Sequence, residues 1–348
     1  MFAILYGVTE LRWRLADDDG GQAALFDQEM ERHIGRGEFR GMEFLHVQAR
    51  RVINEVPKAS RVPFRWTINA YRGCSHACTY CFARPTHEYL GMNSGDDFDK
   101  RIVVKINAVE RVRAELAPGR WAGDHIAMGT NTDPYQRCEG KYRLTQGIVG
   151  ELSAAANPFS ILTKSTLILR DLELLAEAAQ RTEVRANFSI GTLDEEVWRT
   201  SEPGTPHPLR RVEAVAKLND AGVPCGVLVA PILPGLSDGR DQLDAVVKAC
   251  VEAGARSITP LLLHLRPGVR EPYMTWLADA HPDLVDRYAG LYPRAYAPAR
   301  TQDDLAGLVR DLVARHGGRS TGPAQARSLP PKPTPPPPPT VSQLQLGM

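Results

Sequence analysis

Three cysteines stand close together in the sequence, at Cys74, Cys78 and Cys81, and no fourth cysteine lies near them. Their spacing is C-x3-C-x2-C. Thiolates are the usual ligands of iron–sulfur clusters, and three of them leave one iron of a 4Fe–4S cluster without a protein ligand. Such an iron can bind and activate a substrate, whereas a cluster held by four cysteines mainly transfers electrons. The spacing therefore indicates an enzyme with a three-cysteine 4Fe–4S site.

Two other uses of the cysteines are less well supported. Six cysteines are few for a disulfide framework in 348 residues, and the short apolar start runs into Asp17, Asp18 and Asp19, which is not typical of a secretory signal. A Cys3His zinc site, with His76 or His87 as fourth ligand, would make the chain a zinc-binding interaction module. Zinc sites usually show two separated ligand pairs, and the sequence has no second pair. We therefore favour the cluster.

The cysteine motif with Tyr80 as the aromatic residue before the third cysteine resembles the signature of the radical SAM superfamily. A wider stretch, from Phe39-Arg40-Gly41-Met42 through the segment 129–136, resembles the DNA repair photolyase-like subgroup beside spore photoproduct lyase. The resemblance implies that the open iron binds S-adenosylmethionine (SAM) and that reductive cleavage gives a 5′-deoxyadenosyl radical. It also implies a one-electron reductant of flavodoxin or ferredoxin type.

The resemblance assigns further cofactor contacts. In the family, the residue at the position of Tyr80 lies near the adenine of SAM. Many members carry a Gly-Gly-Glu-like sequence that holds the SAM amino group, and this chain departs from it after Gly129. Thr130, Asn131 and Asp133 offer hydroxyl, amide and carboxylate acceptors there. The alternative is that Asp133 simply begins an Asp-Pro turn.

Two residues at the end of the fourth predicted strand match family positions that touch the ribose or carboxylate of SAM. They are Asn187 and Ser189, and the alternation of a strand places Arg185 on the same face. Arg185 is therefore predicted to face the same pocket and pair with the carboxylate. Internal hydrogen bonding is an equally good explanation for Asn187 and Ser189. The segment 227–231 is predicted to line the adenine pocket or the barrel core.

The other cysteines and the nearby histidines carry weaker signals. Cys138 lies in a polar segment, where a thiol can return a hydrogen atom to a product radical, so it is a catalytic candidate. An exposed cysteine without a role is the favoured interpretation. Cys225 and Cys250 have apolar neighbours and are predicted to be buried. His76 and His87 flank the cluster segment and can tune a cluster by hydrogen bonding, although we expect His87 to be exposed.

Strands and helices alternate between residues 61 and 266, which predicts an α/β fold with a parallel sheet and right-handed crossovers. The predicted strands are 64–70, 125–129, 159–163, 184–189, 225–230 and 257–263. The predicted helices are 103–117, 145–156, 169–180, 208–221 and 239–253. Six such units form a partial (β/α)6 barrel, with the site at the carboxyl ends of the strands. The resemblance implies the same core.

The sequence predicts four parts. Residues 1–60 form an N-terminal extension packed on the barrel, with a helix at 22–34 and a strand or helix at 44–54. Residues 61–266 form the core, and 267–316 form a C-terminal helical cap with helices at 272–292 and 303–315. Residues 317–348 form a proline-rich tail, predicted to be disordered because prolines and polar residues cannot build a core.

Composition limits the classes of function. The chain is 43% hydrophobic and 24% charged, as in an ordinary globular protein, and no apolar run is long enough for a membrane span. Free cysteines and an oxygen-sensitive cluster favour the reducing cytoplasm. The net charge of +1 gives no bulk attraction to nucleic acid. A nucleic-acid lesion stays one candidate substrate, beside radical modification of a small molecule, a peptide or RNA.

Overall fold

Six parallel strands form the main sheet in the computed structural model, which describes residues 30–57, 60 and 62–320. The strands are β4 (Trp66–Ile68), β7 (Ile126–Met128), β8 (Phe159–Thr163), β9 (Val184–Ser189), β10 (Cys225–Ile232) and β11 (Ile258–Leu262). Their order in the sheet follows the chain, and β3 (Ile53–Glu55) adds an antiparallel strand beside β4. This arrangement confirms the predicted partial (β/α)6 barrel.

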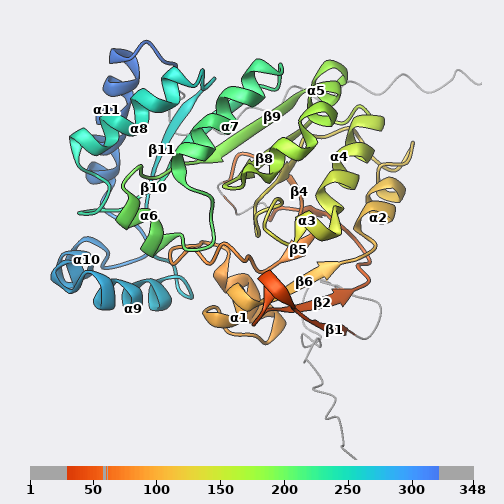
Figure 1. The fold of residues 1–348 in the computed structure, drawn as a ribbon, viewed down its shortest axis with the longest axis horizontal. Helices are drawn as coiled ribbons and strands as arrows, with labels where there is room; N and C mark the ends of the chain where they lie inside the picture. Colours follow the sequence, from red (N-terminus) through yellow and green to blue (C-terminus); the bar gives the residue numbers. More distant parts are fainter. Residues whose placement is uncertain (1–29, 58–59, 61, 321–348) are drawn as a thin grey trace, which may run out of the picture.

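Helices cover the outer face of the sheet (Figure 1). They are α2 (Ala108–Glu115), α4 (Leu144–Ala154), α5 (Leu172–Arg181), α7 (Pro208–Asp220) and α8 (Arg240–Glu252). In β9, Val184, Ala186 and Phe188 are buried, while Arg185 and Asn187 between them keep some exposure. This alternation directs one face of each strand to the helices and leaves the other facing the barrel interior.

A second, smaller sheet contains β1 (Glu31–Ile34), β2 (Glu43–Val47), β6 (Arg101–Lys105) and β5 (Tyr71–Arg72), in that order. The predicted helix at 22–34 is wrong over the four residues of β1, and its remainder lies outside the described residues. The predicted helix at 103–117 is wrong over its first residues. Ile102, Val103 and Val104 are β-branched and fully buried between β2 and β5, so they form a strand, and the helix begins at Ala108. The segment 44–54 is extended, in β2 and β3.

Several short elements were not predicted because each is too short for a periodic pattern. They are α1 (Asp96–Lys100), α3 (Glu139–Tyr142), α6 (Glu195–Ser201) and the 3-10 helices at Gly37–Phe39, Arg84–Leu90, Thr166–Asp171 and Pro282–Leu284. Most of them lie in the connections that follow barrel strands. They are therefore placed at the carboxyl ends of the strands, where the site of such a barrel lies.

Three helices follow the barrel: α9 (Arg270–Ala280), α10 (Val285–Leu291) and α11 (Ala299–Arg315). The helix predicted at 272–292 is interrupted near Pro282 and forms α9 and α10, and the helix predicted at 303–315 corresponds to α11, which begins at Ala299. Helix α11 packs on α8 and β11 (Figure 1). The predicted tail starts too early, because the Ile258 N–H donates to the Arg319 carbonyl at 3.1 Å and Ser320 forms a bridge with Ile258. Residues 321–348 lie outside the described residues, and the four-part division stays a prediction.

Within the described part, no helix is long and apolar enough to cross a membrane.

Candidate active site

The cysteine segment leaves β5 through a turn that requires glycine. Gly73 has φ +79°, and a Cβ there would lie 2.9 Å from the backbone oxygens of Phe98 and Arg101. The next N–H, that of Cys74, donates to the Phe98 carbonyl at 3.0 Å. Cys74 and Cys78 are buried and Cys81 is partly exposed. The three cysteines therefore occupy a tight loop, 73–82, held close to α1, and we refer to it as the cysteine loop.

The three thiols lie close enough to disfavour one another's ionisation. Burial raises the pKa of Cys74, Cys78 and Cys81, and the charges of Asp133, Cys81 and Cys78 raise that of Cys74 further. Thiolates gathered in this way need a cation, and metal binding is the usual source of one. The loop therefore has the electrostatic character of a metal-binding site.

The spread of the sulfur atoms separates a cluster from a single zinc ion. Tetrahedral zinc holds thiolates at about 2.3 Å, which brings the ligand atoms within about 4 Å of one another. Among the described residues, the three cysteines do not form a group of His, Cys, Asp or Glu ligand atoms lying within 4.8 Å of one another. A cluster suits this wider spacing, because each thiolate binds a different iron.

His87 is buried, so the expectation that it is exposed is wrong. Its Nε2 lies 3.0 Å from the Arg101 carbonyl oxygen.

Two buried hydroxyls between the cysteines support the same conclusion. Ser75 Oγ and Thr79 Oγ1 are shielded from solvent, and neither has a hydrogen-bond partner in the described part of the chain. A buried donor without a partner is destabilising. Hydroxyls in these positions fit donation to the sulfur atoms of a cluster, which commonly accept such bonds. The residues of the cysteine loop therefore fit a 4Fe–4S cluster.

One wall of the cysteine loop is the segment that follows β7. The Thr132 hydroxyl and the Gln136 amide both donate to the Gly73 carbonyl, at 2.6 and 3.0 Å. The Gln136 side-chain oxygen accepts from the Ser75 N–H at 3.0 Å. Gln136 is fully buried. Its amide thus joins the two ends of the first turn of the loop and fixes its position.

The carboxylate of Asp133 is bonded to other residues of the protein. It accepts from the Thr163 hydroxyl at 2.6 Å and from the Lys164 N–H at 2.7 Å, and His76 Nδ1 lies 3.3 Å away. Burial alone would raise the pKa of Asp133, but His76, Thr163 and the Lys164 N–H outweigh it and lower the pKa. Asp133 also accepts from the Tyr135 N–H at 2.9 Å, a bond that fits the alternative of an Asp-Pro turn. Its contact with SAM stays a prediction.

Thr130 and Asn131 are held by a residue that the sequence did not single out. Asn69, the residue directly after β4, donates to the Thr130 hydroxyl at 3.0 Å and accepts from the Asn131 N–H at 3.0 Å. Asn69 is buried, whereas Thr130 and Asn131 are partly exposed. The two predicted SAM-binding residues thus lie side by side at the carboxyl ends of β4 and β7, and their contact with SAM stays a prediction.

The opposite wall is the end of α6. The Thr79 N–H donates to the Ser201 carbonyl at 3.0 Å, and the Gly204 N–H donates to the His76 carbonyl at 3.0 Å. A Cβ at Gly204 would lie 2.2 Å from the Ser75 carbonyl oxygen. The absence of a side chain at Gly204 is therefore what allows the two backbones to meet.

A buried charged network joins this wall to the barrel. Glu202 accepts from the hydroxyl of Tyr80, from Arg211, and from the Lys164 ammonium at 3.0 Å. Lys164 also donates to Ser189 Oγ at 2.7 Å, and its nitrogen lies 5.4 Å from the centre of the Tyr80 ring. Burial alone would raise the pKa of Glu202, but Arg211 and Lys164 outweigh it and hold the pKa at about 2. The network brings together two predicted residues, Tyr80 and Ser189.

Sequence reasoning missed Lys164, Glu202 and Arg211. Glu202 and Arg211 lie in a connection and a helix, where charged residues are ordinary. Lys164 directly follows β8, and the rule that active-site residues follow barrel strands would have found it. It is the one charged member of the network with appreciable exposure, at 13% of its side chain against 4% for Glu202 and 1% for Arg211. Its ammonium is therefore the group of this network that a ligand can reach.

The residues of β9 lie at different depths of the barrel. Ser189 is buried and donates to the Ala230 carbonyl at 2.6 Å, and Asn187 is partly exposed. Arg185 is exposed and pairs with Glu183 at 2.6 Å, near the amino end of the strand. The expectation that Arg185 faces the same pocket is therefore wrong, because the strand carries it to the other end. The SAM contacts of Asn187 and Ser189 stay predictions.

Cys138 is fully buried, so the favoured interpretation as an exposed cysteine is wrong. It lies in the core immediately before α3, and burial raises the pKa of its thiol. The ionisable groups that interact electrostatically with its thiol are Glu139, Tyr71 and Tyr142, and the three loop cysteines are not among them. Its role as a hydrogen-atom donor stays a prediction. Cys225 and Cys250 are buried, as predicted.

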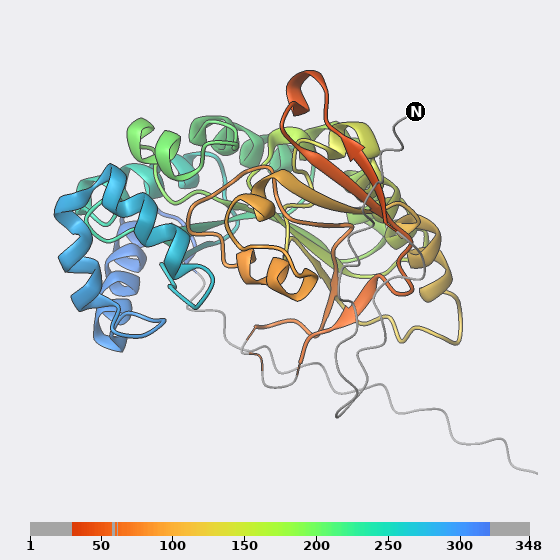
Figure 2. The same ribbon diagram turned by 90° about the horizontal axis from the view of Figure 1, so that it is seen from below.

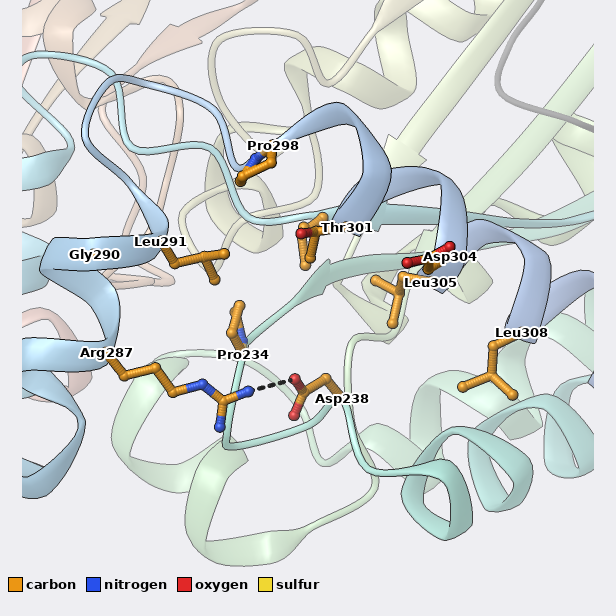
Figure 3. Close-up of a pocket in the computed structure, with 11 residues that line it drawn as sticks. Pro234, Asp238, Arg287, Gly290, Leu291, Pro298, Thr301, Asp304, Leu305 and Leu308 are labelled. Carbon is orange, nitrogen blue, oxygen red and sulfur yellow. Dashed lines mark hydrogen bonds and ion pairs between the residues drawn. The ribbon is translucent and has the colours of Figure 1, made fainter.

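A cavity of about 630 Å³ lies elsewhere, between α10, α11 and the connection after β10 (Figure 3). Its lining is mostly apolar, with Leu291, Leu305 and Leu308 at its walls, and Arg287 pairs with Asp238 across one side. No residue of the cysteine loop lines it. The cavity therefore belongs to the cap, and the candidate active site is the region between the cysteine loop, Lys164 and the strand ends.

Comparison with known proteins agrees with this geometry. Residues 68–248, more than half of the chain, match the family model described as the radical SAM superfamily. An uncharacterized protein of Mycobacterium tuberculosis (strain ATCC 25618 / H37Rv) is 46% identical over 300 residues, which cover 86% of this chain and 88% of that protein. An uncharacterized protein of Methanocaldococcus jannaschii is 28% identical over 199 residues, covering 57% of this chain and 70% of that protein.

Among solved structures, the fold resembles spore photoproduct lyase complexed with dinucleoside spore photoproduct, with a TM-score of 0.58. The two chains are 18% identical, and the match covers 80% of this chain and 81% of that one. A lyase mutant with bound AdoMet and the same dinucleoside gives a TM-score of 0.56 at 17% identity, over 76% of this chain and 78% of that one. Together with the family model and the cysteine loop, these matches show that the chain belongs to the radical SAM superfamily and is a radical SAM enzyme.

Proposed function

We propose that the chain binds a 4Fe–4S cluster through Cys74, Cys78 and Cys81 and uses it to cleave SAM. The observation that carries the proposal is the loop itself: three thiols, those of Cys74 and Cys78 on buried residues, that do not gather within the 4.8 Å expected around one ion, with two unpartnered hydroxyls between them in the described residues. When bound, the cluster supplies the electron that splits SAM to a 5′-deoxyadenosyl radical. A one-electron reductant of flavodoxin or ferredoxin type would deliver that electron, and a reducing cytoplasm suits such a site.

The protein's own residues would bind and orient SAM. The Lys164 ammonium, fixed by Glu202 and Ser189, is placed to pair with the SAM carboxylate. Tyr80 lies against Lys164 and gives an aromatic surface for the adenine. Thr130 and Asn131 offer acceptors to the amino group from the segment that follows β7. Walls on both sides of the loop reduce the entry of water, which strengthens each of these polar contacts.

Anaerobic reconstitution tests the proposal. The chain should bind about four iron and four sulfide ions, and with dithionite it should convert SAM to 5′-deoxyadenosine and methionine. Replacing Cys74, Cys78 and Cys81 together by Ala should remove nearly all iron and visible absorption. Cys250→Ala, which removes a buried thiol outside the loop, is the matched control and should keep both. Full iron content in the triple variant, or stoichiometric zinc without iron in the purified chain, would overturn the cluster.

For the substrate we propose a nucleic-acid lesion, with radical modification of a small molecule, a peptide or RNA as the alternative. The fold resembles that of a spore photoproduct lyase complexed with a dinucleoside spore photoproduct. Phe82, directly after the third cysteine, is 58% exposed. An exposed aromatic ring beside a reactive centre suits stacking with a planar base that has left a duplex.

The charge of the chain limits how such a substrate would bind. One arginine of the extension is neutralised locally, because Arg32 pairs with Glu43. We therefore expect weak, salt-sensitive binding to undamaged duplex DNA. The decisive assay offers ultraviolet-damaged duplex to the reconstituted enzyme. Enzyme that cleaves SAM but shows neither salt-sensitive binding nor lesion reversal would exclude this substrate class without affecting the cluster proposal.

A further inference from the structure

The β1–β2 hairpin presents a carboxylate and two imidazoles on one face, and none of these residues belongs to the cysteine loop. Glu31 is paired directly with His46 across the two strands, and His33 lies two residues along β1, so all three side chains share that face. One ligand atom from each lies within 4.8 Å of the others. The ring centres of His33 and His46 are 3.9 Å apart. The hairpin thus gathers three ligating groups around one point.

His46 is oriented as metal-binding histidines usually are. Its Nε2 lies 2.7 Å from the hydroxyl of Tyr142, on α3, and the two rings meet edge to face at 80°. With Nε2 engaged by Tyr142, Nδ1 is left for an ion. Ligating histidines commonly bond through their second nitrogen to such an outer partner, which fixes the ring.

His33 has a nitrogen that the described part of the protein does not satisfy. Its Nε2 is shielded from solvent and lies 3.0 Å from a carboxylate oxygen of Glu31, but no hydrogen bond of acceptable geometry reaches it. Charged His33 would be attracted to Glu31, yet it would also lie against the second imidazole. A cation held between the carboxylate and the two neutral rings satisfies all three groups at once.

We infer that Glu31, His33 and His46 bind one divalent transition-metal ion of the zinc class. Two imidazoles and a carboxylate suit Zn²⁺, Co²⁺ or Ni²⁺, whereas Mg²⁺ and Ca²⁺ prefer oxygen ligands alone. Glu31 is exposed and the histidines are half-exposed, so water completes the coordination. The ion joins β1 to β2 and, through Tyr142, joins the hairpin to α3. The hairpin, drawn in red, stands out from the barrel in Figure 2.

The test uses the full chain with its cysteines occupied by a reconstituted cluster, so that thiolates do not bind the added metal. After treatment with a chelator, Zn²⁺ is titrated by calorimetry and Co²⁺ by its visible absorption. We expect one ion per chain and a Co²⁺ spectrum without sulfur charge transfer. Joint His33→Gln and His46→Gln should remove this binding. Tyr142→Phe should keep the stoichiometry but weaken affinity by roughly tenfold, as loss of an outer partner does.

His316→Gln, which removes a histidine bound to Asp244 on another surface, is the matched control and should bind metal normally. The same titration in the chain with Cys74, Cys78 and Cys81 replaced by Ala gives a second measurement that does not depend on the cluster. Absence of Zn²⁺ binding in both forms would overturn the inference. Binding that survives loss of His33 and His46, or Co²⁺ absorption with sulfur character, would assign the ion elsewhere and overturn it too.

Discussion

The substitution Glu202→Gln tests the buried network of Lys164, Glu202 and Arg211 most directly. The substitution keeps the shape of the side chain but removes its charge, which leaves Arg211 and Lys164 without their shared carboxylate. Glu202 and Arg211 are almost completely buried, so water cannot replace the lost partner. We expect the variant to be less stable at neutral pH and to lose the fixed position of Tyr80.

The size of the effect follows from the pKa of Glu202, which is about 2 against a usual 4.5. Each pH unit of such a difference corresponds to about 1.4 kcal/mol, so the charged form contributes on the order of 3 kcal/mol to folding. Removing one partner from a buried ion pair typically costs ~3–5 kcal/mol. Each kcal/mol lowers the Tm of a domain of ~150–250 residues by roughly 2–4 °C, so we expect a fall of roughly 6–12 °C.

The assay is urea unfolding of the two chains across a range of pH. Because folding lowers the pKa of Glu202, its contribution is fully present above about pH 4.5 and is lost as the pH falls towards 2. The gap in unfolding free energy between wild type and variant should therefore narrow over that interval. Glu195→Gln, on the exposed face of α6, is the control and should change stability by less than about 0.5 kcal/mol. The reasoning would be refuted if, at pH 7, Glu202→Gln lowered the unfolding free energy no more than Glu195→Gln does.

Two further predictions concern the backbone. Gly204→Ala should lower the iron content after reconstitution, because its Cβ would lie 2.2 Å from the Ser75 carbonyl oxygen. Gly150→Ala is the control: its Cβ would enter open space, so it should leave the iron content unchanged and stabilise α4 by about 0.5–1 kcal/mol. Equal iron contents in the two variants would contradict this prediction. Ending the chain at residue 320 should change Tm by less than about 4 °C, but ending it at 317 should lower Tm more, since it removes the bond from Ile258 to Arg319. Thermal unfolding of the two truncated chains measures both Tm values, and equal Tm values would show that residues 318–320 do not stabilise the fold.

Local patterns in the sequence were enough to predict the barrel. Each of the six predicted strands overlaps a parallel strand, and the helices from α4 to α8 lie within a few residues of their predicted ranges, apart from the short α6. Alternation and periodicity report which face of an element is buried, and that is a local property. The error at β6 has the same origin. Ile102, Val103 and Val104 precede a helical pattern without a break, and only their pairing with β2 and β5 makes them a strand.

The cysteine motif could be found from sequence because its spacing is local, but its surroundings could not. Gln136, Gly204 and Glu202 lie more than 50 residues away in the chain and meet the loop only through the fold. A buried glutamine, a glycine and a glutamate carry no pattern of their own. His87 and Cys138 were misjudged for a related reason, since polar neighbours in the sequence do not prevent burial by distant segments.

Electrostatics explains why the distant residues matter to the cysteines. Burial raises the pKa of the Cys78 thiol most, and Glu202 raises it further, while Lys164 and Arg211 lower it. The two cations share a single carboxylate, so the network keeps one excess positive charge beside the loop. A site of three thiolates is negative and the Asp133 carboxylate beside it adds to that charge, so the positive excess of the network offsets part of it. The same network would therefore stabilise the ligated thiolates, hold Tyr80 and present Lys164 to an anionic group of the cofactor.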